Sequence, residues 1–204
     1  MKTPDTVYKP EYKILLIVDP QIDFITGTLP VMGAQEAMDH LARYVRDKGY
    51  QYDAIIVTAD RHGFRHCSFT ENGGQWPCHC VESSIGAAIW PALMYALKSY
   101  ADRLTILYKG ENNNKEEYSI FQNSEAATII DNIIYTKSSG IDNHEYRTKI
   151  DICGLAGDVC VANTLEDALK RYPNVTFNIL SDYIASIDSD ICISKLKQSL
   201  MSLK

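Results

Sequence analysis

Short apolar runs that alternate with helix-like segments are the feature that most constrains how this chain of 204 residues can fold. The first run, YKILLIV, is almost continuously Ile, Leu and Val, which is typical of a strand buried on both faces of a parallel sheet. Residues 34–48 have the spacing of an amphipathic helix, with Leu41 and Val45 on one face. This alternation predicts βαβ units in a doubly wound α/β sheet. The predicted strands are residues 12–18, 54–58, 104–108, 149–153 and 175–180, with further helices near 91–100, over 159–171 and in the last 15 residues.

Two longer segments interrupt this rhythm. Residues 61–90 are rich in His, Cys, Gly and Trp, whereas residues 110–148 mix polar stretches with an apolar piece, ATIIDNIIYT, whose secondary structure the pattern does not decide. Long loops in compact domains are usually functional, and ligands of open α/β sheets bind beyond the carboxyl ends of the strands. We therefore predict one domain over residues 1–204 with a functional loop at about 60–90.

Charge and hydropathy disfavour several classes of function. The net charge is −6 and no cluster of Lys or Arg occurs, so no nucleic-acid interface is expected. No stretch approaches the ~18 apolar residues of a membrane helix, so no membrane association is expected. The apolar run at residues 14–18 is too short for a secretory signal, which predicts a cytoplasmic protein. A small-molecule substrate fits this balance.

Residues that can do chemistry follow four of the predicted strands. Asp19 follows the first strand, Asp60 and His62 follow the second, Lys109 follows the third, and Cys160 comes after the fourth in GLAGDVC. Because the carboxyl ends of parallel strands meet at one edge of a sheet, these side chains are expected to converge there. The convergence carries more weight than any one of the residues.

Cys160 is the candidate nucleophile. Gly154 and Gly157 allow a sharp turn before a helix, and a helix N-terminus or a nearby cation lowers the pKa of a thiol. Taken alone, Cys160 is typical of a small core residue, Lys109 of a surface lysine and Asp19 of a turn cap. Together they favour catalysis, in which Lys109 stabilises the thiolate and Asp19 takes the thiol proton and passes it to a leaving group.

A set of possible metal ligands combines Asp60 and His62, on one turn after a strand, with His79 from the distant stretch WPCHC. Such an oxygen–nitrogen set accepts Zn²⁺, Fe²⁺ or Mn²⁺ and leaves positions open for water or substrate. The flanking thiols of Cys78 and Cys80 are spaced too tightly for a usual zinc knuckle, and a disulfide between them would close a strained ring. The loop at about 60–90 is therefore predicted to bind metal through its histidines.

Five stretches of the chain together resemble one known family, although each alone is a weak pattern. In order, they are VDPQIDF, TADRHGFRHCSF, WPCHCVESSIGA, KG followed by YSIF, and GLAGDVCV. Over roughly residues 13–188 the chain resembles the isochorismatase-like cysteine hydrolases and, within them, the nicotinamidases. The resemblance implies a three-layer α/β/α sandwich around a mostly parallel, roughly six-stranded Rossmann-like sheet. It also implies a homo-oligomer.

The resemblance implies a role for the residues of the nucleophile region. Asp19, Lys109 and Cys160 match a catalytic triad, and the backbone N–H groups of Ala156 and Cys160 match an oxyanion hole. The bond between Leu155 and Ala156 matches a cis non-proline peptide, which persists only where the surrounding structure enforces it.

The resemblance also implies a divalent metal and a pocket for an aromatic ring. The metal would be held by Asp60, His62 and His79, with Zn²⁺ expected first and Fe²⁺ or Mn²⁺ as alternatives. Glu71 and His66 are candidates for a further ligand, and water is favoured in the remaining positions.

Three aromatic residues, Phe24, Trp76 and Tyr118, match positions that wall a pyridine ring, with ordinary core packing as the alternative for each. Arg61 and Val159 depart from the residues common at their positions in nicotinamidases. These departures leave the prediction of an amide hydrolase intact.

The expected activity is hydrolysis of nicotinamide to nicotinate and ammonia, a step of NAD salvage, through a cysteine thioester with the metal orienting the pyridine nitrogen. One alternative is another amidohydrolase of the same superfamily, which would act on a carbamoyl, ureido or other small amide without needing metal. A non-catalytic metal-binding module, or a metal or thiol buffer built on the Cys-rich loop, would have no use for a triad.

Overall fold

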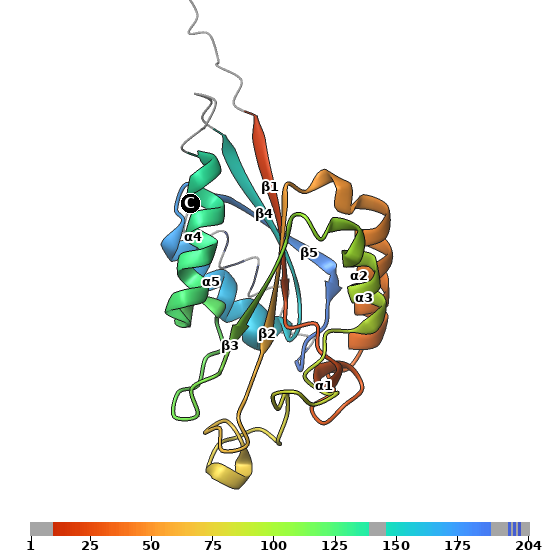
Figure 1. The fold of residues 1–204 in the computed structure, drawn as a ribbon, viewed down its shortest axis with the longest axis vertical. Helices are drawn as coiled ribbons and strands as arrows, with labels where there is room; N and C mark the ends of the chain where they lie inside the picture. Colours follow the sequence, from red (N-terminus) through yellow and green to blue (C-terminus); the bar gives the residue numbers. More distant parts are fainter. Residues whose placement is uncertain (1–9, 139–145, 189–195, 197, 199, 201–204) are drawn as a thin grey trace, which may run out of the picture.

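A computed structural model of the chain describes residues 10–138, 146–188, 196, 198 and 200. The described residues contain one sheet of five parallel strands in the spatial order β3-β2-β1-β4-β5 (Figure 1). These strands correspond to the five apolar runs of the sequence. The described residues therefore form one strand fewer than the roughly six that the family resemblance implied. The strands are β1 (Glu11–Val18), β2 (Ala54–Asp60), β3 (Leu104–Lys109), β4 (Arg147–Gly154) and β5 (Thr176–Ile184).

Helices cover both faces of the sheet and confirm the predicted α/β/α layers. Figure 1 shows α2 (Ala34–Lys48) and α3 (Pro91–Leu97) on one face, and α4 (Ser124–Ser138) and α5 (Ala162–Arg171) on the other. The short helix α1 (Ile22–Ile25) follows β1, and a π-helical turn (Gly157–Val161) precedes α5. Single 3₁₀ turns occupy Gly49–Gln51, Thr70–Asn72, Lys98–Tyr100 and Ile120–Gln122. The helix predicted for the last 15 residues lies almost entirely outside the described residues.

The sheet is buried on both faces because each central strand sends alternate side chains into two separate cores. From β1, Leu15 and Ile17 pack beneath α2 and α3, whereas Ile14 and Leu16 pack beneath α4 and α5. All four are at most 2% exposed. Burial of each such side chain contributes about 1.5–3 kcal/mol to stability, so the strands are firmly held and can present their last residues in fixed positions.

Helix α4 resolves the apolar piece that the sequence pattern left undecided. The side chain of Asn123 accepts hydrogen bonds from the N–H groups of Glu125 and Ala126 and so caps the first turn. Ile130 and Ile134 are buried at helical spacing, at 1% exposed each. The piece is apolar on more than one side of the helix, which blurs the periodicity that would have predicted it.

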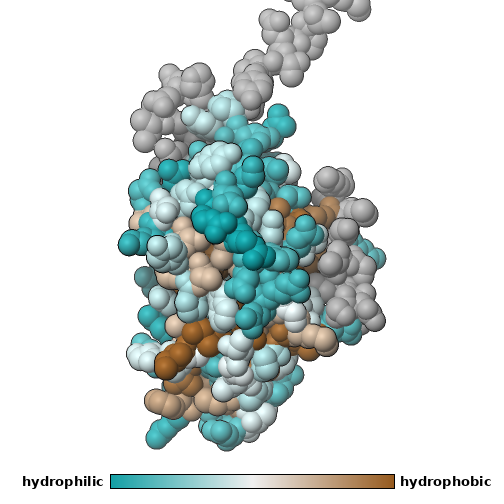
Figure 2. All heavy atoms as spheres, turned by 90° about the vertical axis from the view of Figure 1, so that its right-hand side faces the viewer, coloured by the Kyte–Doolittle hydropathy of each residue, from teal (hydrophilic) through white to brown (hydrophobic). Residues whose placement is uncertain are grey.

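The surface that carries α2 and α3 is largely hydrophilic, and Figure 2 shows its hydrophobic atoms gathered toward the end where the strands finish. Met32 and Ile85, which are 87% and 82% exposed, belong to loops that follow α1 and β2. Among the described residues, no helix has both the length and the apolar character needed to cross a membrane.

Candidate active site

The ends of three neighbouring strands bring the predicted charged residues together. Asp19 comes directly after β1, and Asp60 and Lys109 are the last residues of β2 and β3, where they are paired in register. Cys160 comes from the turn between β4 and α5. All four are buried, with exposed fractions of 0% for Asp19 and Lys109, 5% for Asp60 and 7% for Cys160.

Lys109 lies at the centre of this cluster. Its Nζ is 2.9 Å from Asp19 Oδ2, 2.5 Å from Asp60 Oδ1 and 3.6 Å from Cys160 Sγ. The hydroxyl of Thr58 donates a hydrogen bond of 2.6 Å to the other oxygen of Asp19. The structure therefore places the other two residues of the predicted triad, Asp19 and Cys160, in contact with the Lys109 ammonium group.

Burial leaves the proton on the thiol of Cys160. Burial raises the pKa of Cys160 well above its usual value, and Lys109 opposes this shift without reversing it. The sequence led us to expect a lowered thiol pKa from the helix N-terminus and the cation, so the desolvation of a buried thiol is the stronger effect here. Burial also raises the pKa of Asp19, again against the pull of Lys109. A carboxylate with a raised pKa is a better base, so Asp19 suits the removal of that proton.

Lys109 stays charged although it has no access to water. Burial alone would lower its pKa, but Asp19 and Asp60 outweigh burial and hold the pKa well above the usual value. At Asp60 burial acts to raise the pKa, yet Lys109 and His62 prevail and lower it. Asp60 is therefore ionised and able to act as a ligand to a cation.

The two histidines of the predicted metal site each hydrogen-bond a backbone carbonyl through Nδ1. A carbonyl oxygen can only accept, so the bonds from His62 Nδ1 to Gly110 O (2.8 Å) and from His79 Nδ1 to Pro77 O (2.7 Å) place the ring proton on Nδ1. In the neutral form of each ring Nε2 is then the unprotonated nitrogen, the form that binds metal. Burial acts to lower the pKa of His62, but the neighbouring Asp60 outweighs burial and raises it, so metal binding at His62 would displace a proton. Within the described residues His62 Nε2 is buried and has no hydrogen-bond partner.

These ligand atoms are close enough for one ion. Single ligand atoms of Asp60, His62 and His79 all lie within 4.8 Å of one another, and His62 Nε2 is 3.7 Å from Asp60 Oδ2. Burial lowers the pKa of His79, which keeps its ring neutral. An orphaned imidazole nitrogen, a neutral second imidazole and an ionised carboxylate fit a divalent cation.

Hydrogen bonds and close packing hold Asp60 and His62 in place. The side-chain amide of Gln21 bonds Asp60 on both sides, accepting from its N–H at 2.7 Å and donating to its carbonyl at 2.8 Å. Gly110 has a φ of +70°, and a Cβ at this position would lie 2.3 Å from His62 Cε1. The Lys-Gly pair at the end of β3 therefore provides the ammonium and the space in which the His62 ring packs.

The two candidates for a further metal ligand are not in position to serve. His66 uses both ring nitrogens on backbone groups, with Nε2 3.1 Å from Lys115 O and Nδ1 3.2 Å from Ser68 N. Its ring instead stacks on that of His62, at a centroid distance of 4.0 Å. Glu71 lies exposed in the 3₁₀ turn of residues 70–72.

One pocket is lined by the predicted nucleophile, Cys160, and by two of the predicted metal ligands, Asp60 and His79. Its wall includes the predicted aromatic residues Phe24, Trp76 and Tyr118, together with Cys160 and His79. Trp76 Nε1 donates to the hydroxyl of Tyr118 at 3.2 Å, so two of the aromatic walls support each other. The structure thus brings together every side chain that the sequence assigned to substrate.

Several other residues line this pocket and were not predicted as substrate contacts. Ile187 reaches it because its N–H donates to Asp158 Oδ1 at 3.1 Å, which ties the segment after β5 to the turn before Cys160. Ser68 belongs to the HCSF stretch, and Glu116 to the polar stretch before YSIF, but neither pattern indicates which side chains point inward. The six residues are Leu29, Val31, Ser68, Glu116, Val159 and Ile187.

The turn before Cys160 has the backbone form that the resemblance implies. The peptide between Leu155 and Ala156 is cis, and both Ala156 and Cys160 line the pocket. That the backbone N–H groups of Ala156 and Cys160 form an oxyanion hole stays a prediction.

The Cys-rich loop does not form a cysteine-based metal site in the described part of the chain. Cys78 and Cys80 belong to neither of the groups of metal-competent side chains found there, and Cys67, Cys78, Cys80, Cys153 and Cys160 are all unpaired thiols. Burial raises the pKa of Cys80 well above its usual value, so it stays protonated. This favours the histidine-based reading of WPCHC.

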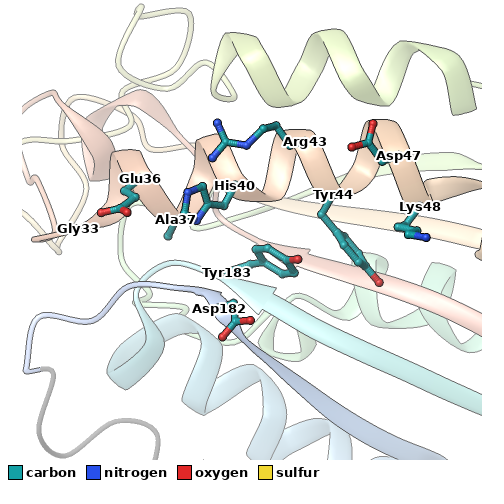
Figure 3. A pocket seen from close by; sticks show the side chains of 10 residues that line it. All are labelled: Gly33, Glu36, Ala37, His40, Arg43, Tyr44, Asp47, Lys48, Asp182 and Tyr183. Carbon is teal, nitrogen blue, oxygen red and sulfur yellow. The ribbon is translucent and has the colours of Figure 1, made fainter.

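A wider groove of about 830 Å³ runs between α2 and the end of β5. Figure 3 shows Tyr44 and Tyr183 side by side in it, with His40 and Arg43 along α2 and Asp182 on β5. The described residues that line it include none of the predicted site residues. The predicted catalytic residues Asp19 and Lys109 do not line this groove either, whereas Cys160 lines the other pocket.

Comparisons with known proteins find relatives that are nicotinamidases or pyrazinamidases. The nicotinamidase of Escherichia coli K12 is 32% identical over 189 residues, which cover 83% of this chain and 81% of that protein. The structure of PnC1 from L. infantum in complex with nicotinate has a TM-score of 0.75 at 28% identity and covers 94% of this chain and 89% of that one. The pyrazinamidase of Pyrococcus horikoshii in complex with zinc has a TM-score of 0.73 at 28% identity, with 94% and 93% covered.

The isochorismatase domain matches residues 13–191, which is most of the chain. The match spans β1 to β5 and includes the whole of the cluster around Lys109. The chain belongs to the isochorismatase family.

Proposed function

We propose that this chain is a nicotinamidase, an amidohydrolase that converts nicotinamide to nicotinate and ammonia. The observation that carries the proposal is the pocket in which Cys160, backed by Lys109 and Asp19, opens on the same space as His79 and Asp60. A nucleophile for an amide carbon and a site for a metal that accepts a ring nitrogen are thereby combined. The similarity to nicotinamidases over most of the chain supports the same activity.

The chemistry begins with proton transfer inside the cluster. Asp19 accepts the proton of Cys160, and the thiolate that forms is stabilised by Lys109 Nζ at 3.6 Å. The sulfur then bonds to the carboxamide carbon. As the C–N bond breaks, Asp19 returns the proton to the nitrogen, which leaves as ammonia. Water next adds to the thioester carbon, the C–S bond breaks, and nicotinate leaves with the thiol restored.

The developing negative charge on the carboxamide oxygen needs donors within the pocket. We assign this role to the backbone N–H groups of Ala156 and Cys160, because both residues line the pocket beside the sulfur. Preorganised donors of this kind typically contribute about 2.7–4 kcal/mol each to transition-state stabilisation.

Phe24, Trp76 and Tyr118 would hold the ring of the substrate between apolar surfaces. Arg61 does not disturb this space, because it lies over the ring of Tyr108 at 4.2 Å and pairs with Glu111. A flat aromatic amide therefore fits the lining of the pocket.

A divalent metal on Asp60, His62 and His79 would supply a Lewis-acidic position for the pyridine nitrogen and so orient the ring. We propose Zn²⁺ as the native ion, supported by the zinc in the pyrazinamidase of Pyrococcus horikoshii. The predictions of one domain over residues 1–204, of a homo-oligomer and of a cytoplasmic location stay predictions.

Ammonia release from nicotinamide by the purified protein tests the proposal. We expect turnover that is lost in a strong chelator and restored by added Zn²⁺, with Cys160→Ala as the inactive control. Absence of turnover on nicotinamide would contradict the proposal. Chelator-resistant release of ammonia from a carbamoyl or ureido compound would then assign the pocket to a different amide.

A further inference from the structure

Asp23 is a buried carboxylate that the proposed chemistry does not use. It lies in α1, in the stretch VDPQIDF, and is 6% exposed. Its Oδ2 accepts a hydrogen bond of 2.7 Å from the N–H of Cys80, and its Oδ1 accepts one of 3.1 Å from the N–H of Thr28. Asp23 therefore joins the helix after β1 to a loop residue 57 positions away.

The N–H that Asp23 binds belongs to the peptide joining Cys80 to the proposed metal ligand His79. Cys80 has a φ of +46°, which is unusual for a residue with a side chain. Its carbonyl accepts from the N–H of His62, a second proposed ligand, at 3.0 Å. The backbone of Cys80 is thus bonded through both its N–H and its carbonyl. The first bond positions the peptide of His79, and the second positions His62.

Phe24, the next residue of α1, contacts His79 through its side chain. The ring of Phe24 packs against the ring of His79 with centroids 5.5 Å apart and an interplanar angle of 53°. Because Nδ1 of His79 also bonds to Pro77 O at 2.7 Å, two contacts set the orientation of the ring. The bond from Asp23 to the Cys80 N–H fixes the backbone of His79, from which this ring extends.

Two close approaches keep the carboxylate of Asp23 from turning away. A Cβ at Gly86 would lie 2.1 Å from Asp23 Oδ2, and a Cβ at Gly27 would lie 2.3 Å from Oδ1. The N–H of Asp23 also donates to Gly86 O at 2.9 Å. The carboxylate is therefore enclosed by backbone and aimed at two N–H groups.

We propose that Asp23 is a positioning residue of the metal site, which holds the peptide of His79 so that its Nε2 faces Asp60 and His62. The inference rests on the proposed metal site. It also gives Cys80 a role, since this residue acts through its backbone and not through its thiol. An amide in place of the carboxylate would keep one acceptor but turn an NH₂ group toward the other N–H.

The test compares metal binding by wild type, Asp23→Asn and a matched control. Asp151→Asn removes another buried carboxylate, 8% exposed, which accepts from Tyr52 at 2.7 Å and Asn178 at 3.0 Å. The dissociation constant for Zn²⁺ is measured by competition with a chromophoric chelator, and the site geometry by the visible absorption of bound Co²⁺. We expect Asp23→Asn to weaken Zn²⁺ binding by about 10–100-fold and to change the Co²⁺ spectrum. Asp151→Asn is expected to keep both readouts even where its melting temperature falls.

Wild-type Zn²⁺ affinity and an unchanged Co²⁺ spectrum in Asp23→Asn would overturn the proposal, as would an equal loss of affinity in Asp151→Asn. If Asp23→Asn does not fold, hydrogen exchange of the wild-type protein decides. The Cys80 amide is then expected to be protected without metal as well as with it, and exchange at an unprotected rate in the metal-free protein would overturn the proposal. None of these readouts depends on turnover, so failure of the proposed activity is seen separately.

Discussion

Thr58 offers a way to test the base without touching the substrate pocket. Its hydroxyl donates to Asp19 Oδ1 at 2.6 Å and accepts from the Asp19 N–H at 3.2 Å, and its carbonyl accepts from the same N–H at 3.1 Å. Thr58 is 0% exposed. Valine has nearly the same shape, so Thr58→Val removes the hydroxyl bond to the carboxylate while the packing remains. The Asp19 N–H loses the hydroxyl as an acceptor but keeps the Thr58 carbonyl.

The size of the expected effect follows from the kind of hydrogen bond that is lost. A hydrogen bond to a charged group is worth about 1.5–3 kcal/mol, and one pKa unit corresponds to about 1.36 kcal/mol. The bond favours the ionised form of Asp19 and so lowers its pKa, against the burial that raises it. Removing the bond should therefore raise the pKa by about 1–2 units.

The pH dependence of kcat/KM for ammonia release measures this shift. Activity requires the ionised carboxylate, so kcat/KM rises with pH through the acid limb, and in Thr58→Val this limb is expected at higher pH. Because Asp19, Lys109 and Cys160 titrate as a coupled group, the limb reports an apparent pKa of the group. Thr58→Ser, which keeps the hydroxyl, is expected to retain the wild-type limb. An acid limb that stays in place in Thr58→Val, or that moves equally in Thr58→Ser, would refute this role for Asp19.

Three further predictions concern the nucleophile, the pocket wall and the core. Cys160→Ala should reduce kcat more than about a thousandfold with metal content unchanged, which ammonia release and metal analysis together would show. Tyr118→Phe removes the acceptor of the Trp76 Nε1–H bond at 3.2 Å, so KM should rise about 2–10-fold with little change in kcat, as measured by steady-state kinetics. Tyr52→Phe leaves Asp151 Oδ2 without its 2.7 Å bond, and should lower the free energy of unfolding by about 1–3 kcal/mol in denaturant titrations while activity is kept.

The arrangement of the site could be predicted because it depends on strand ends. A buried run of Ile, Leu and Val predicts a central parallel strand, and the residue that follows such a strand must lie at the carboxyl edge of the sheet. Asp19, Asp60 and Lys109 were therefore placed together from sequence alone, and the pairing of Asp60 with Lys109 is their register in the sheet. The catalytic and metal-binding roles of these residues stay predictions.

What could not be predicted depends on loops and on burial. Glu116 and Ile187 enter the pocket through long-range contacts of irregular segments, such as the bond from the Ile187 N–H to Asp158, which leave no periodic trace in the sequence. The direction of the Cys160 pKa also needed the structure, because the nearby cation and the desolvation act in opposite senses and only the extent of burial decides between them.

Asp60 joins the two halves of the site, and this limits what its substitution can reveal. One of its oxygens is 2.5 Å from Lys109 Nζ, and the other is 3.7 Å from His62 Nε2. Replacing Asp60 by Ala would remove a metal ligand and also leave Lys109 with a single buried carboxylate, which would alter the charge that Cys160 and Asp19 experience. Inactivity of that variant would therefore not separate metal binding from thiol chemistry. His79 packs against Phe24 and bonds to Pro77. Among the described residues, His79 is therefore a proposed metal ligand whose replacement leaves the ion pairs and the thiol contact of Lys109 intact.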